Sequence, residues 1–239
     1  MKSADQPIFS PSLSDLPLRD MITGVIFDMD GLLVDSEPWW RAAETNVFGS
    51  LSQAPSASDF KEMMGNRIEE VIARWRIKHP WQGMSDEAVK VAIVDEVQRL
   101  VTTNAQLMPG VVNLLEQLQK KKMPVALASS SPLRLIRGLM QHYGIYNYFH
   151  VVCSAEAEDF GKPHPAVFIT AAKHLGIDPT ELLVIEDSFN GVIAAKAARM
   201  KCLAVPTPEH AAQPRFAAAD LVLPSLTMFD DEVWELLSR

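Results

Sequence analysis

Two aspartates, Asp28 and Asp30, give the strongest indication of chemistry in this chain. They follow the apolar run 22–27, whose length and β-branched content predict a strand buried on both faces. Alternate residues of an extended chain point the same way, about 7 Å apart along the strand. Two carboxylates this close repel each other, so the pair predicts a metal ion, a shared proton or both. The alternative is a solvated pair that merely ends the strand.

Three serines, Ser129 to Ser131, end a second apolar run at 124–128 and are followed by Pro132. Proline at a helix start, preceded by hydroxyl and backbone N–H groups, is typical of a strand-to-helix turn that faces an anion. Serines in this position also cap helices without binding a ligand. The pattern therefore permits an anion site but does not require one.

Lys162 lies in the proline-rich segment 160–165, which cannot form a helix or an inner strand. The lysine is therefore held on a constrained loop. A compact ammonium group there suits the neutralisation of nearby carboxylates and of an anionic substrate. A solvated surface charge is the ordinary alternative for a lone lysine.

A further apolar run, 182–185, ends in Glu186 and Asp187 and is followed by Ser188. Asp187 and Ser188 could simply cap the helix that begins near Ser188. Together with Asp28, however, the acids would complete a site of hard oxygen ligands. Magnesium prefers such a set and usually takes one or two carboxylates plus phosphate oxygens of the substrate.

These four motifs together resemble those of the haloacid dehalogenase superfamily, and the resemblance covers nearly all of residues 21–228. The resemblance implies phosphoryl transfer, with Asp28 as the nucleophile that forms an aspartyl-phosphate and Asp30 as the general acid and base. It implies that the Ser129 hydroxyl and the Ser130 backbone N–H bind the transferring phosphoryl group. Lys162 would balance the negative charge.

The same resemblance implies a Mg²⁺ cofactor. Its ligands would be the Asp28 carboxylate, the backbone carbonyl of Asp30 and Asp187, with Glu186 helping directly or through water. In its motif sequences the chain is most similar to bacterial hexose-phosphate phosphatases that act on 2-deoxyglucose 6-phosphate. These motifs read DMDGLLVDSEPWW, ASSSP, GKPHP and EDSFNG. We therefore expect a small phosphorylated sugar as the substrate.

Two other functions compete with the phosphatase. β-Phosphoglucomutases share this core and cap but carry a histidine on the first cap helix, where this chain has Trp40. A catalytically silent binding protein of the same fold would usually have lost a motif residue, and Asp28, Asp30, Lys162 and Asp187 are all present. Both comparisons favour hydrolysis.

The alternation of strand and helix patterns predicts a doubly wound α/β fold with a parallel, Rossmann-like sheet, built from 21–37 and 107–239. Segment 38–106 interrupts the alternation with helical patterns at 39–48, 66–78 and 86–105. The resemblance identifies it as a small helical cap inserted after the first strand. Within it, Arg67 is expected to contact a substrate anion or hydroxyl, unless it is a solvated arginine at a helix start.

Composition restricts the partners. A net charge of −8 over 239 residues argues against a nucleic-acid-binding surface. No apolar run reaches the ~18 residues of a membrane-spanning helix, so we expect no membrane association and a cytoplasmic location. Cys153 and Cys202 lie in predicted strands and are expected to be buried free thiols. We expect residues 1–20 to form a flexible leader and the protein to be a monomer.

Overall fold

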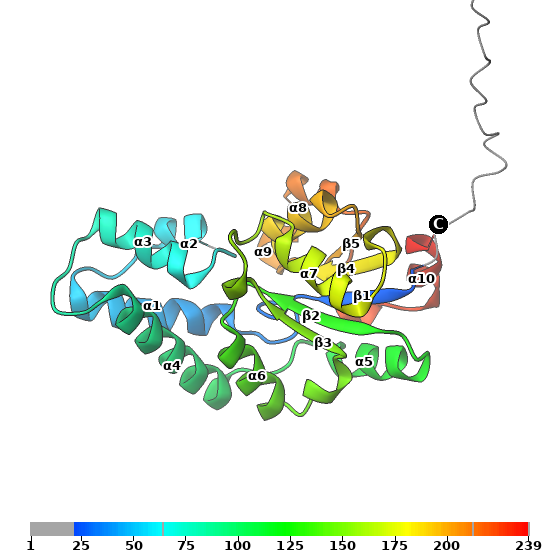
Figure 1. The fold of residues 1–239 in the computed structure, drawn as a ribbon, viewed down its shortest axis with the longest axis horizontal. Helices are drawn as coiled ribbons and strands as arrows, with labels where there is room; N and C mark the ends of the chain where they lie inside the picture. Colours follow the sequence, from blue (N-terminus) through cyan, green and yellow to red (C-terminus); the bar gives the residue numbers. More distant parts are fainter. Residues whose placement is uncertain (1–21, 64, 212, 239) are drawn as a thin grey trace, which may run out of the picture.

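The chain folds into a layered α/β part and a separate group of helices that lies at one end of it (Figure 1). This computed structural model describes residues 22–63, 65–211 and 213–238. The expected leader, 1–20, lies outside the described residues.

One sheet of six parallel strands forms the centre of the described α/β part. The strands are β1 (Gly24–Phe27), β2 (Val125–Ser129), β3 (Val151–Ser154), β4 (Leu182–Glu186), β5 (Lys201–Ala204) and β6 (Leu221–Val222). They lie in the order β3-β2-β1-β4-β5-β6, so the chain starts in the middle, moves to one edge and then returns to the other side of β1. This reversal is a topological switch point, where ligands bind in open α/β sheets. The predicted doubly wound, parallel sheet is confirmed.

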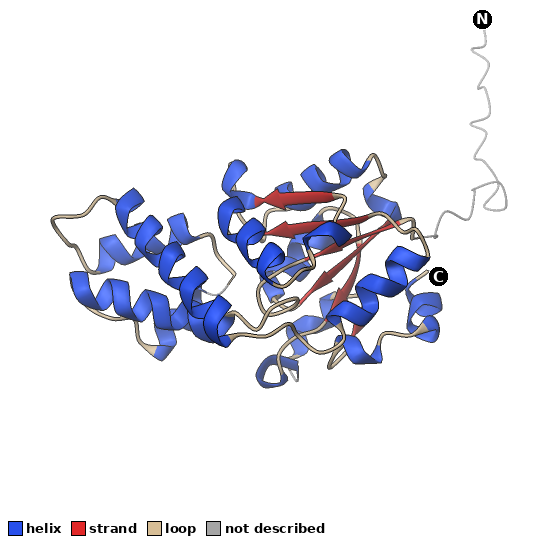
Figure 2. Ribbon diagram, turned by 90° about the horizontal axis from the view of Figure 1, so that it is seen from below, coloured by secondary structure: helices blue, strands red, loops and turns tan. Residues whose placement is uncertain are grey.

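The strands are apolar on both sides because helices cover both faces of the sheet (Figure 2). Val25 and Phe27 belong to one hydrophobic cluster and Ile26 to the other, as the two-residue period of a strand requires. The first cluster includes side chains of α5 (Val111–Lys120), α6 (Leu133–His142) and α10 (Asp231–Leu237), and the second includes those of α7 (Ala166–Leu175) and α8 (Phe189–Ala197). The short helix α9 (Pro208–Ala211) follows β5. Cys153 and Cys202 are buried and free, as predicted.

Four helices make up the inserted part: α1 (Glu37–Leu51), α2 (Ala57–Met63), α3 (Ile68–Lys78) and α4 (Asp86–Asn104). Aromatic rings form its interior, where Phe48 lies 5.6 Å from Trp75 and 6.1 Å from Trp81 between ring centroids. The sequence analysis placed no helical pattern between residues 48 and 66, but α2 lies there. Ser56 and Asp59 explain this helix, because each side chain accepts a hydrogen bond from the backbone N–H of the other, as in a capping box.

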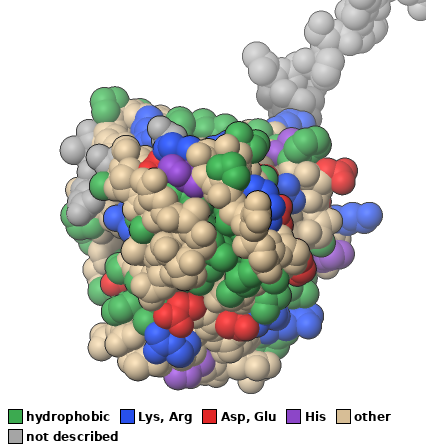
Figure 3. Space-filling model, turned by 90° about the vertical axis from the view of Figure 1, so that its left-hand side faces the viewer, with side chains coloured by type: hydrophobic (Ala, Val, Ile, Leu, Met, Phe, Trp, Pro, Cys, Tyr) green, Lys and Arg blue, Asp and Glu red, His purple; other side chains and the backbone are tan. Residues whose placement is uncertain are grey.

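The two linkers between the helical part and the sheet run side by side. Val34 and Leu107 form an antiparallel bridge, and the Met108 N–H donates to the Leu33 carbonyl at 2.9 Å. The pairing begins only four residues after Asp30, so it holds α1 against the carboxyl end of β1. On the outer face of the helical part, acidic and basic side chains are interspersed (Figure 3).

Candidate active site

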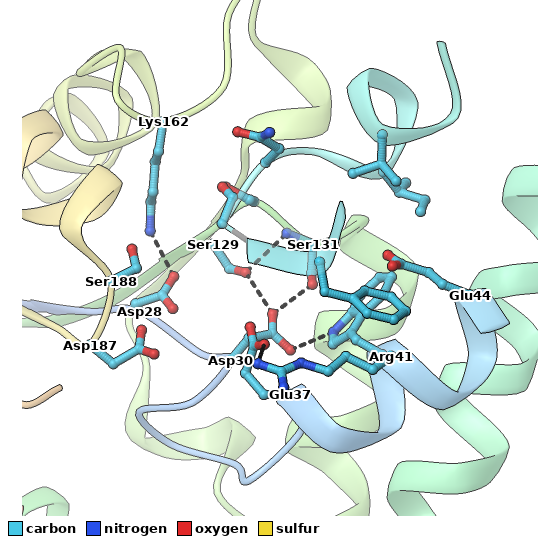
Figure 4. Close-up of a pocket in the computed structure, with 17 residues that line it drawn as sticks. Asp28, Asp30, Glu37, Arg41, Glu44, Ser129, Ser131, Lys162, Asp187 and Ser188 are labelled. Carbon is cyan, nitrogen blue, oxygen red and sulfur yellow. Dashed lines mark hydrogen bonds and ion pairs between the residues drawn. The ribbon is translucent and has the colours of Figure 1, made fainter. Parts of the chain in front are cut away.

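A cleft opens between the carboxyl ends of the strands and the inner face of the helical part (Figure 4). Its empty volume is about 770 Å³, open solvent at the mouth included. The core residues that line it are Asp28, Asp30, Ser129, Ser130, Ser131, Lys162, Asp187 and Ser188. The structure therefore brings four distant segments to one place, as the positions of the motifs predicted.

Lys162 is buried between two carboxylates at the floor of this cleft. Its Nζ lies 2.7 Å from Oδ1 of Asp28 and 2.6 Å from Oε1 of Glu186, and it also donates to the Ala128 carbonyl at 3.1 Å. Burial lowers the pKa of Lys162, but the two carboxylates outweigh burial and hold that pKa above its ordinary value. The ammonium therefore stays charged and can neutralise anionic oxygens next to Asp28.

The Asp28 carboxylate combines burial with excess negative charge. Burial raises its pKa to about 7, although the Lys162 ammonium lowers it, and Glu186 and Asp30 add to the increase. A carboxylate that must attack phosphorus has to be ionised. Positive charge beyond that of Lys162 would therefore increase the ionised, nucleophilic fraction of Asp28 at neutral pH.

Asp187 supplies the place for that charge. Its carboxylate is 8% exposed, and none of the described residues donates a hydrogen bond to it. Burial, followed by the charges of Glu186 and Asp28, raises the pKa of Asp187 well above its ordinary range. Oxygens of Asp28, Glu186 and Asp187 lie within 4.8 Å of one another. These three carboxylates share one ammonium, that of Lys162, and such a set of hard oxygen ligands fits a Mg²⁺ ion.

The position of the Asp187 carboxylate requires a glycine at residue 31. The φ of Gly31 is +76°, and a Cβ there would lie 2.3 Å from Oδ2 of Asp187. Any side chain at residue 31 would therefore be strained and would also displace this carboxylate.

Glu186 is held by hydrogen bonds to its neighbours, and its expected help in metal binding stays a prediction. Its Oε1 accepts from Lys162, while its Oε2 accepts from the backbone N–H and the hydroxyl of Ser188 at 3.1 and 3.0 Å. A Cβ at Gly191 would lie 1.9 Å from its carboxyl carbon, so α8 approaches this side chain as only glycine permits. Glu186 thus orients Lys162 and the start of α8.

Asp30 accepts hydrogen bonds from both parts of the protein. Its Oδ1 accepts from the Ser36 hydroxyl at 2.6 Å and from the Trp40 indole N–H at 2.9 Å. Its Oδ2 accepts from the hydroxyls of Ser131 at 2.7 Å and Ser129 at 3.4 Å. A serine hydroxyl can also accept a hydrogen bond from a protonated Asp30, which the indole N–H cannot do.

The serine cluster is divided between two tasks. Ser129 lies at the end of β2, where its hydroxyl accepts from the Ser131 N–H at 3.0 Å. The Ser130 hydroxyl donates to the Gly65 carbonyl at 3.2 Å and so links the sheet to the helical part. Both residues line the cleft beside Asp28, which is compatible with the expected phosphoryl-binding role.

Arg67 does not lie where the sequence analysis expected it. It is absent from the described lining of the cleft and reaches the core loop 155–159 instead. Its guanidinium donates to the carbonyls of Ala155, Glu158 and Asp159 at 3.2, 2.7 and 3.2 Å and pairs with Glu70 at 2.9 Å. These neighbours use its donors, so in this structure Arg67 fastens the helical part to the core rather than facing a substrate.

A polar stripe on α1 escaped the sequence analysis. Glu37, Trp40, Arg41 and Glu44 are spaced i, i+3, i+4 and i+7, and all four line the cleft. The spacing was visible in the sequence as one helical face. It resembled an ordinary solvated face, because only the fold reveals that the sheet edge lies opposite.

Comparisons with known proteins agree with this geometry. The sequence profile of haloacid dehalogenase-like hydrolases matches residues 22–199, and the chain belongs to this family. It is 40% identical over 207 residues to hexitol phosphatase B of Escherichia coli (strain K12), covering 86% of this chain and 93% of that protein. It is 34% identical over 221 residues to the "Probable pseudouridine-5'-phosphatase" of Drosophila melanogaster, covering 90% and 94%.

Solved structures share the fold as well. The crystal structure of CbbY from Rhodobacter sphaeroides in complex with phosphate superposes with a TM-score of 0.80 at 24% identity, covering 87% of this chain and 96% of that one. Together with the relatives, the family identifies the chain as a phosphoric monoester hydrolase that acts on small phosphorylated metabolites. None of the helices in the described ranges combines the length and apolarity that spanning a lipid bilayer requires.

Proposed function

We propose that this protein is a Mg²⁺-dependent phosphatase of hexose phosphates such as 2-deoxyglucose 6-phosphate, working through an aspartyl-phosphate. The observation that supports this most is the spatial order of the side chains along the cleft. Asp28, Lys162 and Asp187 lie at one end, α1 lies at the other, and Asp30 lies between them (Figure 4). A phosphoryl group beside Asp28 would thus leave its alcohol facing Asp30 and α1.

In the proposed reaction, the Asp28 carboxylate attacks phosphorus in line, and the bond to the leaving oxygen breaks. Lys162 and Ser129 stabilise the negative charge on the equatorial phosphoryl oxygens. Asp30 donates a proton to the leaving alkoxide. The ionised Asp30 then takes a proton from the water that hydrolyses the aspartyl-phosphate, which releases phosphate and restores both acids.

The Asp28 and Asp187 carboxylates and the Asp30 carbonyl would hold the Mg²⁺ ion, with Glu186 as a neighbour that fixes Lys162. When bound, the ion would supply charge stabilisation to the phosphoryl oxygens and favour the ionised form of Asp28. The buried Asp187 carboxylate accepts no hydrogen bond from the described residues, which supports this assignment.

The choice of a hexose phosphate is supported by the similarity to hexitol phosphatase B, whose name describes a phosphatase of sugar alcohols. A panel of phosphate monoesters assayed for phosphate release with Mg²⁺ tests it directly. We expect hexose and hexitol 6-phosphates to have the highest kcat/KM values. A panel in which they rank below phosphoglycolate and glycerol phosphate would contradict the substrate assignment. The cytoplasmic location and the monomeric state stay predictions.

The mutase alternative predicts a different product. With β-glucose 1-phosphate and a trace of glucose 1,6-bisphosphate, a mutase accumulates glucose 6-phosphate with little phosphate release, and NMR follows both. We expect phosphate release instead, because the Trp40 indole has no proton-accepting nitrogen with which to delay the use of Asp30 as a base. Accumulation of glucose 6-phosphate would overturn the phosphatase proposal.

A further inference from the structure

The inner face of α1 is built to meet the leaving group rather than the phosphate. Glu37, Arg41 and Glu44 lie across the cleft from Asp28 and Lys162 (Figure 4). All three side chains come from one helical stripe and line the same cavity as the catalytic aspartates. Whatever alcohol is attached to the phosphoryl group must therefore contact this stripe.

Glu44 is the unusual member of the stripe. It is 7% exposed, and within the described part of the chain no side chain or backbone group donates a hydrogen bond to its carboxylate. Glu186 is also buried, but it accepts three hydrogen bonds, one from Lys162 and two from Ser188. The Glu44 side chain lines the cleft, so its carboxyl group contributes no hydrogen bond to the packing of α1.

Burial, followed by the charge of Glu37, raises the pKa of Glu44 to about 8. Burial also raises the pKa of Glu37, followed by the effect of Asp30. Glu44 therefore lacks donors that would stabilise its ionised form, whereas Glu37 lies 3.8 Å from the Arg41 guanidinium. A ligand that donates hydrogen bonds to the Glu44 carboxyl group would therefore bind more tightly in the cleft.

Resting on the proposed function, we propose that Glu44 binds hydroxyl groups of the leaving alcohol, which makes monophosphates of neutral polyols the preferred substrates. Hydroxyl groups donate hydrogen bonds to a carboxylate and also accept one from a protonated carboxyl. A polyol therefore satisfies Glu44 in either protonation state.

The acidic stripe disfavours a second anionic group on the leaving alcohol. A carboxylate or phosphate there would face Glu37 and Glu44, and it would repel either of them once that group ionises. Arg41 is the basic side chain among the described cap residues of the lining, and it is already within 3.8 Å of Glu37. Arg67, the other candidate for an anion, is occupied by backbone carbonyls. No cation among these cap residues is therefore left to balance the charge of a second anion.

The remaining lining suits the carbon chain of a polyol. Phe60, Ile68 and Val71 contribute apolar surface from α2 and α3 beside the carboxyl groups. A leaving group that presents C–H faces to these residues and hydroxyls to Glu44 would satisfy both. This mixture of apolar walls and a few polar groups is typical of small-molecule sites.

The test compares the wild-type enzyme with Glu44→Leu on three substrates: sorbitol 6-phosphate, 2-phosphoglycolate and p-nitrophenyl phosphate. The matched control is Glu87→Leu, since the carboxylate of Glu87 lies on α4 and is 71% exposed. We expect the wild type to prefer sorbitol 6-phosphate over 2-phosphoglycolate. Glu44→Leu, which can neither donate nor accept a hydrogen bond, should lower kcat/KM for sorbitol 6-phosphate about 10- to 100-fold, mainly through KM. Its loss on p-nitrophenyl phosphate, which has no hydroxyl groups to bind, should be at least about tenfold smaller.

Equal losses on sorbitol 6-phosphate and p-nitrophenyl phosphate would overturn the hydroxyl-binding role of Glu44. A preference for 2-phosphoglycolate, or a strong preference for glucosamine 6-phosphate over glucose 6-phosphate, would overturn the neutral-polyol class. A wild-type enzyme that hydrolyses none of these esters, p-nitrophenyl phosphate included, would instead contradict the proposed phosphatase function. A failure of the Glu44 proposal can therefore be distinguished from a failure of the proposed phosphatase function.

Discussion

The indole N–H of Trp40 donates a 2.9 Å hydrogen bond to Oδ1 of Asp30, across the junction between the inserted helices and the sheet. A helix of the cap thus holds the proposed acid and base directly. Because the same Asp30 oxygen also accepts from Ser36, at the start of α1, movement of this helix would change both contacts. Docking of the cap and the orientation of Asp30 are therefore coupled.

Trp40→Phe should lower kcat for a hexose phosphate about tenfold, because a hydrogen bond to a charged group contributes ~1.5–3 kcal/mol and part of it is retained by Ser36. The loss on p-nitrophenyl phosphate should be smaller, since a phenolate leaves without a proton. Trp39→Phe is the matched control, because Trp39 packs against the hydrophobic core and lies outside the described lining. Identical losses in both variants would indicate a packing effect only.

The acids at the strand ends were predictable from the sequence because parallel strands bring their carboxyl ends to one edge. A buried apolar run followed by Asp28 or Asp187 needs no long-range information to be placed there. The Ser56 and Asp59 capping box was also visible and would have predicted α2.

The direction of Arg67 and the role of Glu44 were not predictable in this way. Arg67 donates to carbonyls about 90 residues further along the chain, and no local pattern indicates which loop will lie beside it. Glu44 lies on a polar helical stripe that a single sequence cannot distinguish from a solvated face. The role of Glu44 is inferred from its burial and from the absence of donors to its carboxylate among the described residues.

Asp28→Asn should abolish turnover with every substrate, by at least about 10³-fold or ~4 kcal/mol, because an amide cannot attack phosphorus as an anion. The fold should survive, since Lys162 keeps its ion pair with Glu186 at 2.6 Å. Phosphate release and thermal unfolding of the variant check the two statements. Residual activity within about tenfold of wild type would reject Asp28 as the nucleophile.

Metal binding should compete with protons at Asp28 and Asp187. The pKa of Asp28 is raised to about 7 and that of Asp187 is raised as well, so the carboxylates retain protons below neutral pH that a cation must displace. Chelation by EDTA should stop the reaction, and Mg²⁺ should restore it. The Mg²⁺ concentration for half-maximal activity should rise as the pH falls from 8 to 6.

Asp187→Asn should weaken the metal affinity, which equilibrium dialysis with Mn²⁺ measures independently of turnover. Asp231→Asn is the control, because its carboxylate lies on α10, is 90% exposed and does not line the cleft. An Asp187 variant with wild-type affinity would move the metal site elsewhere.

Arg67→Lys should weaken docking of the helical part, because a lysine cannot donate to three carbonyls and a carboxylate at once. We expect kcat/KM to fall about three- to tenfold on all substrates alike, equivalent to ~0.7–1.4 kcal/mol. Hydrogen exchange in 155–159 should become faster. Arg74→Lys, on the exposed side of α3, is the control. A loss confined to substrates with hydroxyl groups would instead restore the expected contact of Arg67 with substrate.

Glu44→Gln should stabilise the protein above neutral pH. The folded-state pKa of Glu44 is about 8, whereas the ordinary value is 4.5, so the folded protein retains a proton that the unfolded chain releases. The stability associated with this proton is complete below about pH 4.5 and is lost as the pH rises to about 8. A neutral glutamine does not undergo this loss.

The difference in Tm between Glu44→Gln and the wild type should therefore be small at pH 5 and reach several degrees at pH 8, measured by thermal unfolding at both pH values. Subtracting the wild type cancels the titration of groups that both proteins share, and Glu37, which faces Glu44, remains in both. Glu87→Gln, with its exposed carboxylate, should show no such pH dependence. A variant that is less stable than the wild type at pH 8 would mean that the Glu44 carboxylate has stabilising partners. That result would remove the physical reason for assigning it to a substrate, because gains in stability upon removal are expected of groups kept for function rather than for folding.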